Sequence, residues 1–151
     1  MDLTQTTPRS VREKLLGLVQ LARTTDKAKA LALGNLGEYE YPSAMDDGLF
    51  EFLGMKGSEF LEFVKVAKSD AEIASYTRGF VEKKSPDEII SFNERWMAST
   101  PKGESLERFR ALRAHIAPER TDVTTWPDLL DLDEGRSVAR REPAKSYTKT
   151  E

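Results

Sequence analysis

The chain has 151 residues, of which 38% are hydrophobic and 32% charged, and its formal net charge is −3. This length predicts a single domain with a substantial core, and no apolar run approaches the roughly 18 residues that a membrane span requires. The chain contains no cysteine, which excludes disulfides, thiolate metal sites and a cysteine nucleophile.

The distribution of charge and the N-terminal residues bear on location and partners. Residues 1–30 carry six Lys or Arg against three Asp or Glu, whereas residues 38–72 carry three against nine. This pattern is typical of ion pairs inside one domain, or of a basic segment that meets an anionic ligand or an acidic partner. The first residues have neither the basic nor the apolar region of a signal peptide. We therefore expect a cytoplasmic protein without a membrane segment.

Three Ser-x-x-Glu boxes, which begin at Ser10, Ser69 and Ser85, each precede an apolar-periodic segment. In such a box the serine and the glutamate satisfy free backbone N–H groups at the start of a helix. The first box predicts a helix over residues 11–23, with apolar residues at helical spacing. A break at Thr24-Thr25 and a second helical run over residues 26–33 follow.

The segment after this run loses the helical period. Glu38-Tyr-Glu-Tyr41 alternates charge and ring, and Pro42 follows it. The alternation predicts a short extended connector near residues 37–42, or one arm of a small hairpin.

The remaining helices are expected over residues 43–54, 58–67, 69–83, 85 onward, 103–116 and 125–134. Together these segments predict an all-α, irregular single-domain bundle of about seven or eight short helices, spanning residues 1–136. Residues 137–151 lack bulky apolar side chains almost entirely and are expected to form a disordered polar tail.

The densest cluster of polar side chains surrounds the expected helix break and comprises Arg23, Asp26, Lys27, Lys29, Tyr39 and Tyr41. An arginine can clamp a carboxylate or phosphate with two hydrogen bonds, and a partly buried lysine can act as a base. Tyrosines can donate to an oxyanion. The structural alternative is an ion pair between Arg23 and Asp26, with solvated lysines and packed tyrosines.

A second group of candidates precedes the last helix and contains Arg120, Asp122 and Trp126. Its polar oxygens either cap that helix or form the far wall of a site shared with Arg23. Both interpretations stay open at this point.

Other site types have little support in the sequence. The single histidine cannot form a metal cluster with a second one, and no glycine-rich phosphate loop occurs. We expect no metal site and no cofactor, although magnesium held by carboxylates in residues 128–134 together with a phosphate substrate stays open. Nucleic acid is an unlikely partner because the sequence pI is about 5.4.

Five strings, at residues 8–15, 17–19, 22–28, 36–39 and 120–136, resemble those of a small bacterial family catalogued as domain of unknown function 5069. The resemblance spans nearly all of residues 2–136. It implies one cytosolic α-helical domain and implies no activity.

The leading functional hypothesis is therefore a binding or regulatory module for a small anionic ligand or a protein partner, centred on residues 23–41. The alternative is an enzyme that uses Lys27 or Asp26 as base, Arg23 as anion clamp and Tyr39 as donor. A homodimer that buries the apolar stripe of the first expected helix is a third hypothesis.

Overall fold

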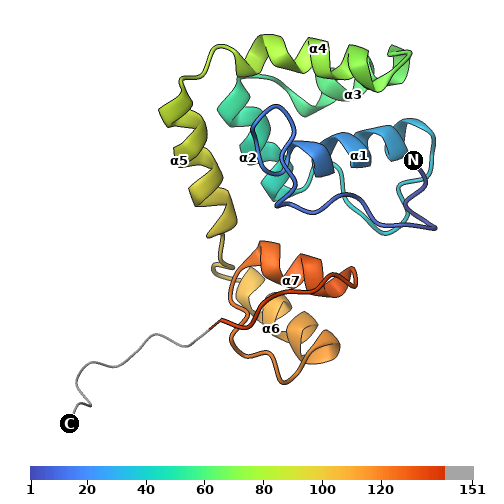
Figure 1. Cartoon of the computed structure of the whole chain (residues 1–151). Coiled ribbons are helices and arrows are strands. Elements are labelled where there is room, and N and C mark those ends of the chain that lie inside the picture. Colours follow the sequence, from blue (N-terminus) through green and yellow to red (C-terminus); the bar gives the residue numbers. More distant parts are fainter. Residues whose placement is uncertain (142–151) are drawn as a thin grey trace. The chain divides into compact units, whose positions relative to one another are not determined.

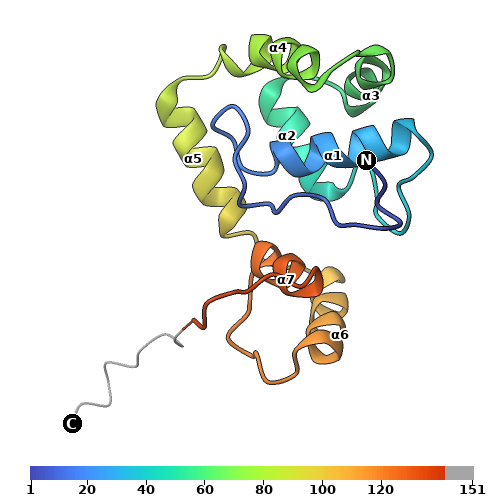
Figure 2. The ribbon, with the colours of Figure 1, turned by 45° about the vertical axis from the view of Figure 1, so that its right-hand side comes forward.

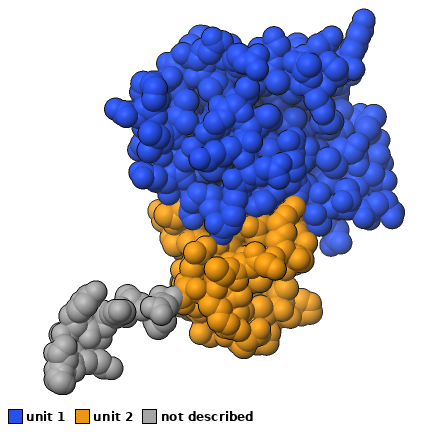
Figure 3. All heavy atoms as spheres, in the orientation of Figure 1, with its two compact units in different colours: residues 1–97 blue, residues 98–151 orange. Residues whose placement is uncertain are grey.

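The computed structural model describes residues 1–141, and the regular structure of that part consists of seven α-helices. The chain divides into two compact units, residues 1–97 (unit 1) and 98–151 (unit 2), which Figure 3 shows in different colours. The predicted all-α class and number of helices are confirmed. The single domain over residues 1–136 stays a prediction, and residues 142–151 of the expected tail lie outside the described residues.

Unit 1 is built around one largely buried helix. Its helices are α1 (Leu21–Ala32), α2 (Ala44–Leu53), α3 (Gly57–Val66), α4 (Asp70–Val81) and α5 (Pro86–Met97). Helix α1 packs against α2 and α3, and the N-terminal residues 1–20 run beside it (Figures 1 and 2). Nine of the 12 residues of α1 are buried, and five of these are polar or charged. A hydrophilic helix therefore passes through the interior of the unit.

The predicted helix over residues 11–23 is wrong, because the first helix begins only at Leu21. Leu16, Gly17 and Gln20 have φ of +54°, +82° and +71°, which a right-handed helix does not allow. The backbones of Leu15 and Leu18 instead exchange two hydrogen bonds of 3.0 Å in a tight turn. The Ser10 box forms only a single turn, in which the Arg12 N–H donates to the serine oxygen.

The predicted break at Thr24-Thr25 does not occur either, because both threonine hydroxyls donate to acceptors that they can reach from a helical backbone. Thr25 Oγ1 donates to the Leu21 carbonyl 2.8 Å away, one turn back, and Thr24 Oγ1 donates to the Asp46 carboxylate. Their helix runs on without interruption to Ala32.

Four of the five apolar residues of the predicted first stripe are nevertheless buried. Val11, Leu18, Val19 and Ala22 have exposed fractions of 2% or less, whereas Leu15 is half-buried. The stripe therefore offers little apolar surface to the proposed dimer, which stays a prediction.

The serines of the other two boxes cap their helices, as the sequence predicts. At Ser85 the Glu88 N–H donates to the serine oxygen, and the Ser85 N–H donates to the glutamate. Ser69 accepts from the Glu72 N–H at the start of α4. Ser43 opens α2 with a complete box in which Asp46 takes the place of glutamate.

The connector between α1 and α2 contains no strand, so the hairpin alternative is wrong. It is not fully extended, because Gly37 has φ of +65° and the Tyr39 N–H donates to the Leu36 carbonyl. A cis peptide bond joins Tyr41 to Pro42.

Unit 2 contains α6 (Ser105–Ile116) and α7 (Trp126–Asp133). Its buried core comprises Phe109, Val123 and Leu129. Residues 137–141, which the sequence assigns to the tail, lie against this unit through hydrogen bonds to Arg120, Asp122 and Asp128. No helix within residues 1–141 combines the length and the apolar character needed to cross a bilayer.

The contact between α2 and α5 requires a glycine. A Cβ atom on Gly48 would lie 2.4 Å from Cζ2 of Trp96. That ring cannot move freely, because it stacks on Phe92 with 4.2 Å between centroids and its Nε1 donates to the Met45 carbonyl.

We predict that Gly48→Ala lowers the free energy of unfolding by about 1–3 kcal/mol, although alanine is the better helix former. The matched control is Gly79→Ala in α4, where a Cβ meets nothing within 4 Å. This control should gain about 0.5–1 kcal/mol. Urea unfolding of both variants measures the difference, and a gain in both would contradict the packing described here.

Candidate functional site

Lys27, the proposed base, is buried and fully hydrogen bonded. Its side chain is 4% exposed. The Nζ atom lies 2.6 Å from Oδ2 of Asp46, 3.1 Å from the Glu40 carbonyl and 3.3 Å from Oγ of Ser43. An ammonium group has three N–H donors, and here each has an acceptor. No donor remains for a ligand.

Asp46 is the centre of this polar network, and its side chain is fully buried. Oδ2 also accepts from the backbone N–H of Ser43 at 2.8 Å. Oδ1 accepts from Nε2 of Gln20 at 2.9 Å and from the hydroxyl of Thr24. One carboxylate therefore caps α2 and neutralises the lysine of α1.

The two charges shift each other's titration. Burial lowers the pKa of Lys27, and the attraction of Asp46 offsets this only in part. Burial alone would raise the pKa of Asp46, but Lys27 and the hydrogen bonds from Lys27, Thr24 and Ser43 hold it below its ordinary value. With 2.6 Å between Lys27 Nζ and Asp46 Oδ2, the two groups form a buried ion pair.

Asp26, the other proposed base, is paired with a residue from the N-terminal arm. Nε and Nη2 of Arg9 each lie 3.0 Å from a carboxylate oxygen of Asp26, and the Arg9 N–H donates to it at 2.8 Å. The Asp26 side chain is 2% exposed. The pairing found for Asp26 is therefore with Arg9, not with Arg23 as the structural alternative expected.

Arg23 and Tyr39 lie together. The guanidinium carbon of Arg23 is 5.7 Å from the centroid of the Tyr39 ring, and Nη1 donates to the Arg9 carbonyl at 3.2 Å. Arg23 is 3% exposed, whereas Tyr39 is half-buried. The Arg23 side chain is therefore largely covered, whereas part of Tyr39 is accessible.

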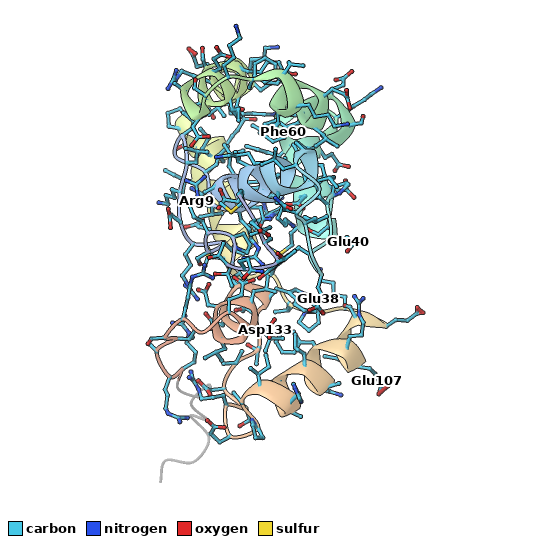
Figure 4. All side chains as sticks on the ribbon, turned by 90° about the vertical axis from the view of Figure 1, so that its right-hand side faces the viewer. Arg9, Glu38, Glu40, Phe60, Glu107 and Asp133 are labelled. Carbon is cyan, nitrogen blue, oxygen red and sulfur yellow. The ribbon has the colours of Figure 1, made fainter. Side chains whose placement is uncertain are left out.

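Tyr39 borders a depression of about 490 Å³ between residues 3–7 and 37–39. Threonine, glutamine and tyrosine side chains line it, together with Glu38 and no lysine or arginine. Glu38 and Glu40 are exposed on this part of unit 1 (Figure 4). The accessible side chains around Tyr39 therefore favour neutral or cationic groups over anions.

Tyr41 supports packing. Its hydroxyl donates to the Gly57 carbonyl at 2.8 Å, and its ring meets Phe50 edge-on with 6.1 Å between centroids. Burial, with a smaller contribution from the charge of Asp46, raises its pKa. A tyrosine in this position holds the connector against α2 and α3.

The second predicted group lies in unit 2. Arg120 and Asp122 form a bidentate ion pair with two distances of 3.0 Å, which holds the pKa of Asp122 well below its usual range. The Trp126 ring packs edge-on against Phe109 with 5.0 Å between centroids, and the backbone N–H of Trp126 donates to the Ser99 carbonyl. The cap of α7 comes from Thr125, as its sequence predicts. A composite site with Arg23 stays a prediction.

Three lysines of unit 1 line a different feature, which we call the α1–α3–α4 groove. Its volume is about 270 Å³, and its apolar lining includes Leu33, Val64 and Ile73. Lys29, Lys65 and Lys68 also line it, against a single carboxylate, that of Asp70. Leu33 is 66% exposed.

The candidate residues drawn from the sequence include Lys29 but not Lys65 and Lys68. A signal was present, because these two lysines are three apart and interrupt an otherwise acidic stretch. Among residues 1–141, no group of three or more His, Cys, Asp or Glu could hold a metal ion.

A model of the family described as Domain of unknown function (DUF5069) matches residues 5–136, so the chain belongs to this family. No curated protein matched the sequence.

We predict that Arg9→Met destabilises the fold by about 2–4 kcal/mol, because it leaves the carboxylate of Asp26 buried without its guanidinium partner. Arg78→Met, at an exposed position on α4, is the control and should change stability by less than about 0.5 kcal/mol. Thermal and urea unfolding provide the comparison. Equal stability of the two variants would show that Asp26 does not depend on Arg9.

The lowered pKa of Asp46 predicts a pH effect of defined sign. Its contribution to stability is complete above the ordinary value of 3.8 and is lost as the pH falls through the lower folded-state pKa. Between pH 5.5 and 2.5, the wild-type free energy of unfolding should therefore fall more steeply than that of Asp46→Asn, which cannot titrate there. Other carboxylates contribute equally to both proteins. Parallel pH profiles would contradict the ion pair.

Proposed function

We propose that this member of the DUF5069 family is a non-enzymatic binding module whose α1–α3–α4 groove takes an acidic segment of a protein partner. The observation that carries the proposal is the combination of an apolar lining with three lysines and one carboxylate. A segment that fits places one or two apolar side chains in the groove and carboxylates opposite the lysines.

The lysines can change partners at little cost. Lys29 pairs with Asp70 at 2.7 Å, and Lys65 pairs with Glu62 at 3.0 Å. The carboxylates of both pairs are largely exposed, at 77% and 70%. Exposed ion pairs of this kind contribute about 0–1 kcal/mol. A partner carboxylate can replace the internal one without disturbing the fold.

The exposed apolar residues supply the second half of the argument. Leu33, which lines the groove at the end of α1, is among the large apolar side chains that unit 1 leaves in solvent. Covering such side chains contributes about 25 cal/mol per Å² of apolar area. Charge alone would select any polyanion, whereas this combination selects a segment with both kinds of side chain.

Two other hypotheses receive less support. A small anion bound by Arg23 and Lys27 would need access to side chains that are 3% and 4% exposed. An enzyme with Lys27 or Asp26 as base would need an accessible proton site. Each N–H of Lys27 already has an acceptor, and the Asp26 carboxylate is 2% exposed and bound by Arg9. We also propose a cytoplasmic location, which the absence of cysteine favours.

A labelled 12-residue peptide that presents leucines at positions i and i+4 between glutamates is the probe for the groove. We predict that the double variant Lys65→Glu/Lys68→Glu binds this peptide at least tenfold more weakly than the wild type, and that affinity falls as salt rises. Fluorescence anisotropy gives the affinity, and amide NMR shifts in α1, α3 and α4 locate the site. The control is Lys14→Glu, an exposed lysine of unit 1 outside the groove, which should bind as the wild type does.

Three results would overturn the proposal. The first is equal peptide binding by the groove variant and by the control. The second is displacement of the peptide by vesicles containing phosphatidylserine, which would make the groove a lipid site. The third is concentration-dependent self-association that Lys65→Glu/Lys68→Glu abolishes, because a second copy of the chain would then be the occupant.

A further inference from the structure

Residues 137–141 are held on unit 2 by their main chain. Nη1 of Arg120 donates to the Val138 carbonyl and Nη2 to the Ala139 carbonyl, both at 3.1 Å. Asp122 accepts from the backbone N–H of Arg141 at 2.7 Å. Two charged side chains thus recognise three main-chain groups of one short segment, independently of the side chains at 138 and 139.

A single side chain of the segment is recognised as well. Nε and Nη2 of Arg141 each lie 3.0 Å from a carboxylate oxygen of Asp128. The Asp128 side chain is 4% exposed, whereas that of Arg141 is 48% exposed. Bidentate arginine–carboxylate pairs combine strength with strict geometry, which lysine cannot reproduce.

The receiving residues are fixed by unit 2 itself. Arg120 and Asp122 hold each other through two hydrogen bonds, and the backbone of Arg120 bonds to Ala117 and Val123. Asp128 lies in the first turn of α7, where the helix dipole favours a carboxylate. The surface is therefore preorganised and does not need residues 137–141 to shape it.

The residues that bind the segment lie inside the region matched by the family model, whereas the segment itself lies after it. Arg120, Asp122 and Asp128 lie within the matched residues 5–136, whereas residues 137–141 follow that match. The surface belongs to the part of the chain that defines the family, and the segment seated on it does not.

We propose that Arg120, Asp122 and Asp128 form a docking site for an extended, arginine-bearing peptide segment, and that residues 137–141 occupy it in cis. The occupant needs two consecutive free carbonyls, followed two residues later by an arginine. The cis segment competes with an outside segment of the same kind, so it reduces the apparent affinity of the site by the fraction of time that it is docked.

The probe is a labelled, C-terminally amidated peptide with the sequence of residues 135–141. We expect the full-length Arg141→Glu variant to bind it at least tenfold more tightly than the wild type, because the cis segment is weakened. Arg140→Glu is the matched control, since it changes the adjacent exposed arginine and should bind as the wild type does. In the peptide, replacing the arginine equivalent to Arg141 by alanine should reduce affinity at least tenfold.

A second variant guards against an indirect effect on folding. Asp128→Asn combined with Arg141→Glu should abolish peptide binding while the circular dichroism spectrum and the amide NMR shifts of unit 1 are retained. The proposal is overturned if Arg140→Glu and Arg141→Glu bind the peptide equally, if neither binds at millimolar peptide, or if Asp128→Asn leaves binding unchanged.

Discussion

The ion pair between Lys27 and Asp46 is the constraint on which unit 1 depends. Helix α1 lies in the interior with a run of polar side chains, and each buried charge needs a partner because desolvation of a lone charge costs several kcal/mol. Asp46, in the first turn of α2, is the partner of Lys27, and Arg9, in the N-terminal arm, is the partner of Asp26. The positions of α2 and of the arm are therefore linked to the charges of α1, which explains why a hydrophilic helix can occupy the centre of the unit.

The charged residues that lie closest together in the sequence are not the ones most accessible to a ligand. Lys27, from the densest cluster of charged residues in the sequence, belongs to a buried polar network in unit 1, in which each of its N–H groups has an acceptor. The lysines of the α1–α3–α4 groove are instead accessible, and two of them form exposed ion pairs that can be exchanged. The surface formed by Arg120, Asp122 and Asp128 in unit 2 has the opposite preference, because it receives a guanidinium group. The two proposed surfaces suit a module that joins protein segments.

The sequence predicts the helices whose boundaries are set locally. The boxes at Ser43 and Ser85 and the caps at Ser69 and Thr125 form, because capping involves residues three apart. The start of α1 could not be predicted, since the left-handed residues Leu16 and Gln20 are ordinary side chains that carry no turn signal. The partners of Asp26 and Lys27 were equally hidden, because they lie 17 and 19 residues away in the sequence. Residue spacing predicts which side chains are neighbours on the same helix, but it does not predict contacts between residues this far apart in the sequence.

A double-mutant cycle on Lys27 and Asp46 tests the central claim most directly. Urea unfolding of Lys27→Met, Asp46→Asn and the double variant gives the coupling free energy between the two side chains. A buried, charge-assisted pair predicts a coupling of at least about 2 kcal/mol, with the double variant more stable than the sum of the single losses implies. Additive losses, with a coupling below about 0.5 kcal/mol, would contradict the account and would return Lys27 to the list of candidate site residues.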